Sequence, residues 1–176
     1  MVTEGNADRI RAIAPAALRC TRMTQSTRSE ARALLRAFLE EDEHYRASAA
    51  VYGDGGGDAL ERALDLFLSR PEIGFVWLAQ VQDGASMHTV GACVVCHAIS
   101  TSSGSVVAKL DDVSIRVDWR GRGIGQQMLA ALMQHLRARG IARIDCGCHR
   151  DNAGAWRFYE RMGFRPLDEE RIAVLL

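Results

Sequence analysis

The chain has 176 residues, of which 48% are hydrophobic and 25% charged, and its 22 basic residues balance its 22 acidic ones. A chain of this size buries close to about 70% of its unfolded surface, so the composition indicates one ordinary globular domain. The balanced charge argues against a nucleic-acid binder, and no apolar run approaches the roughly 20 residues that cross a bilayer.

The N-terminus lacks the basic-then-apolar order of a signal peptide, so we expect a cytoplasmic protein. In that compartment we expect the five cysteines to be free thiols. Cys93-x-x-Cys96 and Cys146-x-Cys148 have spacings that invite a zinc interpretation, but both pairs lie inside apolar strand patterns. We therefore expect small buried residues at these positions and no metal site.

The N-terminal part of the chain predicts an arm, a strand and a helix. Residues 1–15 show no hydrophobic period, so we expect a flexible arm ahead of one domain over residues 16–176. Residues 17–23 alternate between apolar and polar and indicate a first strand. Thr27 and Glu30 have the spacing of a capping box, and the apolar residues after them repeat with a helical period. A first helix is expected from this point.

Two features follow the first helix. The acidic run Glu40–Glu43 is either a solvated helix end or an electrostatic attractant for a cationic substrate at the rim of an acceptor site. The glycine-rich residues 53–58 predict a flexible loop, and a second helix then begins at Asp58 and ends at Pro71. A mobile segment here would lie where a substrate enters.

Three antiparallel strands are predicted next. Residues 75–81 and 90–99 alternate or are β-branched and are joined by a short polar turn, which is the pattern of a hairpin. A small polar loop then precedes a long fourth strand over residues 106–117. This strand leads directly into a glycine-rich turn.

The glycine-rich turn separates the fourth strand from an amphipathic helix. Gly121, Gly123 and Gly125 remove side chains where backbone N–H groups point out of a helix N-terminus, and Arg120 and Arg122 add positive charge. The turn therefore suits a phosphate or pyrophosphate. It lacks the Gly-Lys-Ser/Thr of a Walker loop and the first glycine of a dinucleotide fingerprint, so neither motif applies.

The C-terminal part of the chain predicts the far edge of the sheet. Residues 142–148 alternate as a fifth strand, which should run parallel to the fourth because a helix separates the two. Asn152 caps a short helix that ends at Gly163. Residues 164–166 and 171–176 each predict a short last strand.

Two motifs in the second half of the chain occur together. The turn has the pattern Arg120-x-x-Gly123-x-Gly125 after a strand, and the short helix has the pattern Asn-x-x-Ala-x-x-Phe-Tyr-x-x-x-Gly-Phe from Asn152 to Phe164. Over about residues 75–176, the chain therefore resembles the GCN5-related N-acetyltransferase (GNAT) superfamily. Within that superfamily, Leu110-Asp111-Asp112 looks similar to the polyamine and diamine acetyltransferases.

The resemblance implies an α+β (mixed α/β) fold with a central mixed, mostly antiparallel sheet of six to seven strands and about four flanking helices. In this fold strands four and five run parallel and splay apart, and the pantetheine arm of acetyl-coenzyme A enters the gap. Fourth-strand N–H groups there stabilise the oxyanion. The residues that the resemblance assigns to the coenzyme are Val113, Ile115, Val117, Arg120, Gly121, Arg122, Gly123, Ile124, Gly125, Gln126, Asn152, Ala155, Phe158 and Tyr159.

Amine acetylation moves two protons. An alkylammonium with a pKa of about 10 must lose a proton before its nitrogen attacks, and the leaving thiolate must gain one. The resemblance places Tyr159 as the general acid. Asp111 or Asp112 is the candidate base, directly or through a water, and strand alternation predicts that only one of them faces the cleft. Polyamine-type relatives favour Asp111, and Glu41 or Glu43 could substitute.

The resemblance implies an acetyl-coenzyme A-dependent N-acetyltransferase that acts on a primary amine of a small molecule by direct attack in a ternary complex. Two alternatives stay open: a peptide or protein N-acetyltransferase, and a non-catalytic acetyl-coenzyme A binding or sensing module. We expect no nucleic-acid, membrane or metal partner, and the resemblance is compatible with a homodimer. His44, His97 and His149 are expected to have no part in the mechanism.

Overall fold

The computed structural model describes residues 18–46, 56–84 and 86–167. These residues form a five-stranded sheet in the order β1-β2-β3-β4-β5, so the described part of the chain has fewer than the expected six to seven strands. Neighbouring strands are antiparallel from β1 to β4, whereas β4 and β5 are parallel, which confirms the mixed α+β fold class. The strands are β1 (Leu18–Arg22), β2 (Gly74–Asp83), β3 (Ser86–Ser100), β4 (Ser105–Ile115) and β5 (Ile144–Cys146).

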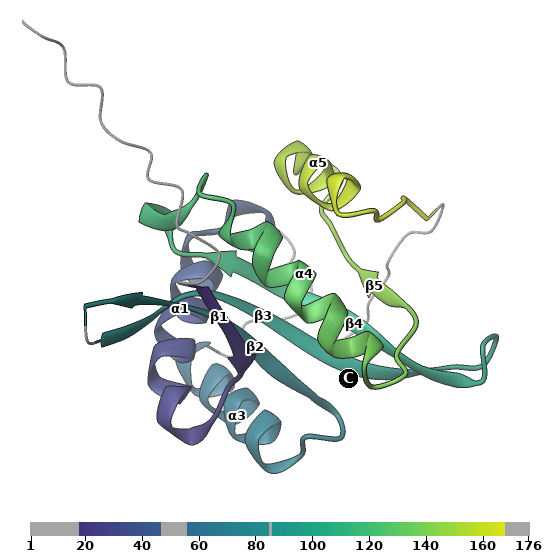
Figure 1. Cartoon of the computed structure of the whole chain (residues 1–176), viewed down its shortest axis with the longest axis horizontal. Helices are drawn as coiled ribbons and strands as arrows, with labels where there is room; N and C mark the ends of the chain where they lie inside the picture. The colour runs from purple at the N-terminus through teal and green to yellow at the C-terminus, as the bar shows by residue number, and fades with distance from the viewer. Residues whose placement is uncertain (1–17, 47–55, 85, 168–176) are drawn as a thin grey trace, which may run out of the picture.

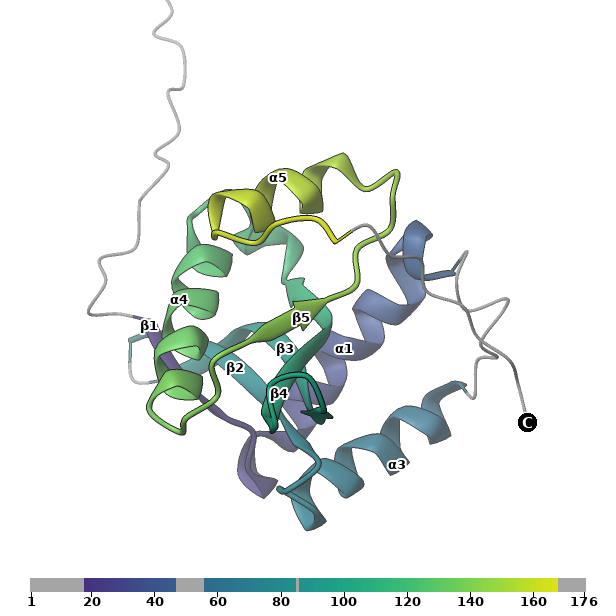
Figure 2. The same ribbon diagram turned by 90° about the vertical axis from the view of Figure 1, so that its right-hand side faces the viewer.

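Helices cover both faces of the sheet (Figure 1). One helix, α4, crosses one face, while α1 and α3 lie on the other, and α5 sits beyond the β5 edge (Figure 2). The helices are α1 (Arg28–Glu41), α3 (Gly56–Ser69), α4 (Ile124–Arg137) and α5 (Ala153–Arg161), with short 3-10 turns η2 (Gln25–Thr27) and η3 (Val117–Trp119).

Strand alternation divides the apolar side chains between two cores. From β2, Phe75 and Trp77 face α4, whereas Val76 and Leu78 face α1 and α3. The indole N–H of Trp77 also donates to the carbonyl of Met128 at 3.2 Å, and this bond ties α4 to the sheet. The sheet is therefore held on both sides, which leaves the β4–β5 edge as the place where it can open.

The first helix is confirmed, but its predicted cap is wrong. The hydroxyl of Thr27 accepts the backbone N–H of Thr24 at 2.9 Å and makes no cap bond to α1. The carboxylate of Glu30 instead accepts the backbone N–H of Thr89 on β3 at 3.1 Å and its hydroxyl as well. Glu30 therefore fixes α1 to the sheet, a long-range use of the residue that local spacing could not reveal.

Two strand predictions at the ends of elements are wrong. Residues 164–166 form no strand, because Phe164 packs its ring against Tyr159 at 5.3 Å between centroids and the chain leaves the sheet. Val117 belongs to the turn η3 and not to β4, which ends at Ile115. The predicted arm over residues 1–15 and the predicted strand over residues 171–176 lie outside the described residues.

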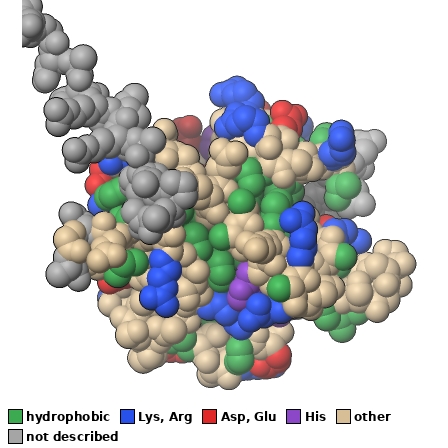
Figure 3. Space-filling view, in the orientation of Figure 1, with side chains coloured by type: hydrophobic (Ala, Val, Ile, Leu, Met, Phe, Trp, Pro, Cys, Tyr) green, Lys and Arg blue, Asp and Glu red, His purple; other side chains and the backbone are tan. Residues whose placement is uncertain are grey.

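Basic side chains on the α4 face lie in several separate groups among apolar and uncharged areas (Figure 3). This distribution agrees with the balanced charge of the sequence and shows no single basic field on the described part of that face. None of the described helices is both long and apolar enough to cross a membrane.

We predict that Gly91→Ala destabilises the protein by about 1–3 kcal/mol, because an added methyl group overpacks this contact. A Cβ at Gly91 would lie 2.6 Å from Cδ1 of Ile115 and 3.1 Å from Sδ of Met128. Gly57→Ala is the matched control, since a Cβ there meets nothing within 4 Å. Chemical denaturation of both variants measures the difference, and equal stabilities would contradict the prediction.

Candidate active site

β4 and β5 pair over only a short stretch. Residues 108–110 of β4 lie beside residues 144–146 of β5, although β4 continues to Ile115. Beyond Leu110 the two strands part, and the chain after β5 turns toward α5 (Figure 2). The splayed gap that the sequence led us to expect is therefore present.

A β-bulge lies where the strands part. Asp111 and Asp112 together oppose the single β3 residue Val94, because the register shifts between Cys93 and Val95. A bulge changes which face and which edge each later residue of the strand presents. The side chains and amides after Asp112 are therefore placed one step out of phase with those before Asp111.

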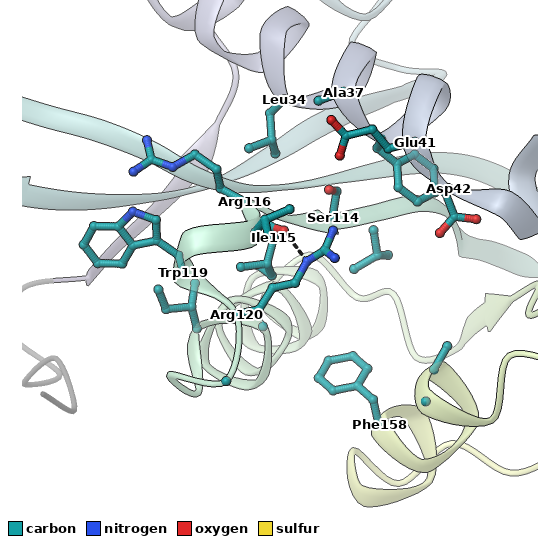
Figure 4. A pocket seen from close by; sticks show the side chains of 18 of the residues that line it. Leu34, Ala37, Glu41, Asp42, Ser114, Ile115, Arg116, Trp119, Arg120 and Phe158 are labelled. Carbon is teal, nitrogen blue, oxygen red and sulfur yellow. Dashed lines mark hydrogen bonds between the residues drawn. The ribbon is translucent and has the colours of Figure 1, made fainter. Parts of the chain in front are cut away.

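The backbone amides beyond the bulge are directed into the gap. The N–H of Arg116 donates to the carbonyl of Val90 on β3 at 2.9 Å. Because successive residues alternate in direction, the N–H groups of Val113 and Ile115 point away from β3. The carbonyl of Ile115 points the same way, since it accepts Nε of Arg120 at 2.9 Å (Figure 4). The open edge of β4 can therefore pair with an extended ligand.

A cleft of about 1480 Å³ opens along this edge. It exceeds the roughly 300–1,000 Å³ of most small-ligand pockets, so it has room for a large coenzyme together with an acceptor. Leu34, Ala37 and Glu41 on α1 form one wall, and Arg120 and Phe158 lie on the opposite wall (Figure 4). Every residue assigned to the coenzyme from the sequence lines this cleft except Arg122.

The glycine-rich turn fits an anionic group. Gly121 and Gly123 have φ of +73° and +75°, a left-handed conformation that glycine adopts without strain. Gly123 is the N-cap of α4, so the free N–H groups of the first helical turn face the cleft. A Cβ at Gly121 would meet nothing within 4 Å. The space in front of the helix end is therefore open to a pyrophosphate.

The arginines around the turn make different contacts. Arg120 fixes the turn to the end of β4 through the bond described above, and Arg116 is paired with Asp118 at 2.7 Å. The guanidinium of Arg122 lies over the ring of Trp119, 4.8 Å from its centroid, which accounts for its absence from the cleft lining. This contact braces the outside of the turn by a cation–π interaction.

A second, smaller cavity of about 680 Å³ lies on the α1 and α3 side of β4. It meets the main cleft at the gap between the strands. The residues that line both spaces are Phe38, Asp42, His44, Val113, Asn152, Ala155 and Tyr159. A ligand in the main cleft and a second ligand in this cavity would therefore meet at these side chains.

Tyr159 is buried at this junction, with 9% of its surface exposed. Burial raises the pKa of its hydroxyl well above the ordinary value of 10.0, and the neighbouring Cys146, which is hydrogen-bonded to it, raises the pKa further. The phenol therefore stays protonated at all physiological pH values. It is able to donate a proton and unable to act as a resting base.

Asp111 and Asp112 both line the smaller cavity, so the expectation that only one of them would face the site is wrong. The bulge is the physical reason, because it breaks the alternation between them. Burial raises the pKa of Asp112 from 3.8 to about 6, and the nearby carboxylates of Asp111 and Asp42 add to the shift. Asp111 is exposed and accepts the thiol of Cys96 at 3.8 Å.

The cysteines are free, as expected from the sequence. Burial raises the pKa of Cys148, and burial together with the Asp111 carboxylate raises the pKa of Cys96. Both line the smaller cavity, and at neutral pH both are thiols and weak nucleophiles. Among residues 18–46, 56–84 and 86–167, no three His, Cys, Asp or Glu side chains converge as a metal site would require.

The acidic run occupies the wall that faces the glycine-rich turn. Glu41, Asp42 and Glu43 line the main cleft, whereas Glu40 pairs with Arg36 at 2.7 Å. The cleft therefore has carboxylates on the α1 side and arginines with a helix N-terminus on the other. Such a division of charge suits an anionic coenzyme on one wall and a cationic ligand on the other.

Several lining residues were not assigned to the site from the sequence. Phe38 follows the apolar spacing of α1 and was indistinguishable from a core residue, yet it is half-buried and faces both spaces. His44 and His149 stack with ring centroids 4.9 Å apart, which places a histidine pair beside the junction. This contact joins the segment just after α1 to the loop after β5, so spacing in the sequence carries no signal for it.

The sequence profile described as "Acetyltransferase (GNAT) family" matches residues 36–164. An uncharacterized N-acetyltransferase of Methanocaldococcus jannaschii is 32% identical over 69 residues, which are 39% of this chain and 30% of that protein. The chain therefore matches about a third of the length of this relative.

Solved structures share the fold at low sequence identity. "A possible acetyltransferase from Clostridium difficile 630" superposes with a TM-score of 0.75 and 12% identity, covering 91% of this chain and 98% of that one. AAC(6')-Iy in complex with the bisubstrate analog CoA-S-monomethyl-acetylneamine gives a TM-score of 0.69 and 15% identity, with 90% and 98% covered.

We predict that Gly123→Ala weakens acetyl-coenzyme A binding about 5- to 30-fold, the equivalent of about 1–2 kcal/mol for a left-handed alanine. The variant turn relaxes away from φ +75°, and binding then has to restore it. Gly140→Ala is the matched control, because Gly140 has the same φ of +75°, has open space around a Cβ and does not line the cleft. Calorimetric titration compares the two, and equal affinities would refute the role of the turn.

Proposed function

The chain belongs to the acetyltransferase (GNAT) family, and we propose that it transfers the acetyl group of acetyl-coenzyme A directly to a primary amine of a small molecule. The observation that carries this proposal is the junction between the two spaces. The main cleft, with its anion-suited turn, and the smaller cavity, with its carboxylates, share lining residues, among them Val113 on β4 beyond its pairing with β5 and Tyr159 on α5.

The chain's own residues fit the coenzyme. Acetyl-coenzyme A supplies the activated acetyl thioester. The turn from Arg120 to Gly125 holds its pyrophosphate with backbone N–H groups, and the free edge of β4 pairs with the pantetheine arm. The N–H groups of Val113 and Ile115 also lie where they can polarise the thioester carbonyl, and such fixed donors need no rearrangement during the reaction.

Asp112 is the base in this proposal. A base works best when its pKa lies close to the operating pH, and burial brings the pKa of Asp112 to about 6. Asp112 accepts one proton of the bound ammonium, directly or through a water, and passes it to solvent. The nitrogen then bonds to the acetyl carbon and loses its second proton to Asp112. Asp111 is exposed and keeps the cavity negative, which raises the pKa of Asp112 and attracts the cation.

Tyr159 is the acid in this proposal. As the carbon–sulfur bond breaks, the Tyr159 hydroxyl gives its proton to the departing sulfur. The second proton from the nitrogen, held by Asp112, or a proton from solvent then reprotonates Tyr159. Its raised pKa ensures that the proton is present before the reaction.

Direct transfer, without an acetylated enzyme, is supported by the raised pKa values of the cavity thiols. Cys96 and Cys148 have raised pKa values and are poor nucleophiles, so the cavity offers no activated thiol to carry the acetyl group.

An assay of free coenzyme A release tests the proposed function. With acetyl-coenzyme A alone we expect background release, and with a suitable primary amine we expect saturable release and an acetylated product of matching amount. The panel comprises alkylamines, arylalkylamines, polyamines, aminoglycosides and lysine peptides. Tight coenzyme binding without turnover for any amine would instead identify a binding module.

We predict that Tyr159→Phe lowers kcat by one or more orders of magnitude, because the sulfur then leaves without its proton donor. The affinity for acetyl-coenzyme A should remain nearly unchanged, since the ring keeps its contacts with Phe158 and Phe164. Steady-state kinetics and calorimetry separate the two effects, and thermal unfolding serves as the folding control. Unchanged kcat would exclude Tyr159 as the acid.

We predict that kcat at saturating amine falls about tenfold per pH unit below about pH 6, because Asp112 must be deprotonated to act and its pKa is raised to about 6. Asp112→Asn should lower kcat at neutral pH by about 10²-fold or more and abolish this limb. Asp111→Asn is the matched control. It should keep the limb but move it to lower pH, because one of the charges that raise the pKa of Asp112 is lost.

A pH–rate profile from pH 5 to pH 9 measures these three forms of the enzyme. An acid limb that survives in Asp112→Asn would assign the base elsewhere.

A further inference from the structure

The smaller cavity has a polar side and an apolar side. Its acidic groups are the carboxylates of Asp42, Asp111 and Asp112, and no Lys or Arg is among the described lining residues. The other polar side chains of the lining are His44, Tyr45, His149, Asn152 and Tyr159. Apart from the residues shared with the main cleft, the apolar side chains of the lining come from α1, α3 and β3. These apolar side chains are Leu35, Leu60, Ala63, Leu64, Phe67 and Val94.

The sheet order places the two sides relative to the coenzyme. The strands run β3-β4-β5, and the main cleft opens at the β4–β5 edge. The carboxylates of Asp111 and Asp112 are on β4, next to that edge, whereas Val94 and the residues of α3 lie one strand further from it. An acceptor that reacts at the gap therefore has its nitrogen among the carboxylates and its other end in the apolar part.

Within residues 18–46, 56–84 and 86–167, no other acidic residue lines that apolar part. Glu41 and Glu43 line the main cleft and are absent from the lining of the smaller cavity. Asp42 is the shared carboxylate, and it accepts the backbone N–H of Tyr45 at 2.8 Å near the junction. A second ammonium group carried several carbons beyond the first would be placed against Leu60, Leu64 and Phe67, where a charge is costly to desolvate.

We infer that the acceptor is a monoamine on a short apolar chain, an alkylamine or arylalkylamine, and not a diamine or polyamine. This inference rests on the proposed acetyl transfer and names its substrate class. The carboxylates bind and deprotonate the reacting ammonium, while the apolar part of the cavity selects the chain by burial of its methylene groups. The resemblance of Leu110-Asp111-Asp112 to polyamine acetyltransferases therefore extends to the reacting end of the substrate alone.

The test is kcat/KM for straight-chain monoamines from ethylamine to octylamine, with α,ω-diamines of the same lengths. We expect each added methylene to raise kcat/KM of the monoamines about fourfold until the apolar part is filled, the usual effect of burying a methylene group. Each diamine should be at least about tenfold poorer than the monoamine of its length, because its second cation loses hydration.

Ala63→Leu provides a second measurement that does not depend on the wild-type series. The larger side chain fills part of the cavity, so the best monoamine should become shorter by one or more carbons. Ala59→Leu is the matched control on the same helix, since Ala59 does not line the cavity, and it should keep the wild-type profile. Thermal unfolding establishes that both variants fold.

The outcomes separate this inference from the proposed function. The transferase itself would be refuted if coenzyme A were released at the same rate without any amine. It would also be refuted if no amine of the panel caused release. Turnover that is equal or faster with diamines, polyamines or lysine peptides would leave the transferase intact and overturn the monoamine assignment. If Ala63→Leu and Ala59→Leu changed the dependence of kcat/KM on monoamine length equally, the cavity would not be what selects the chain.

Discussion

The site depends on the parting of β4 from β5. Pairing stops after Leu110, and the bulge at Asp111 and Asp112 turns the following amides toward the open edge. One irregularity therefore supplies both free N–H groups for an extended ligand and two carboxylates on the far face of the strand. The two cores hold the remaining strands on both sides, so the opening is confined to one edge.

Charge is divided across this opening in a way that suits its two ligands. The α4 N-terminus and Arg120 make one wall favourable to phosphate, while the end of α1 makes the other favourable to a cation. Glu30 holds α1 in place through Thr89, so the acidic wall is fixed to the same sheet that carries the bulge. Tyr159 lies between the walls as a neutral phenol, and burial raises its pKa further above the physiological range.

Local patterns in the sequence predicted much of the fold and of the cleft wall that carries the glycine-rich turn. The turn from Arg120 to Gly125 and the Asn152 cap are short-range features, and the cap is present, with the Asn152 side chain accepting the N–H of Ala155 at 2.9 Å. Features that join distant segments were missed or misjudged. The Glu30–Thr89 contact replaced a predicted cap, and the bulge placed both aspartates in one cavity although alternation predicted one. Such features depend on tertiary register, which spacing along the chain does not encode.

The most direct test of direct transfer across the gap is a rapid-quench single turnover with excess enzyme, followed by mass spectrometry of the intact protein. With acetyl-coenzyme A alone, the account predicts that the protein stays unacetylated and that free coenzyme A stays at background. On addition of an acceptor amine, coenzyme A and acetylated amine should form at one rate. An acetylated enzyme that forms before the amine is added, and that then passes its acetyl group to the amine, would contradict the account.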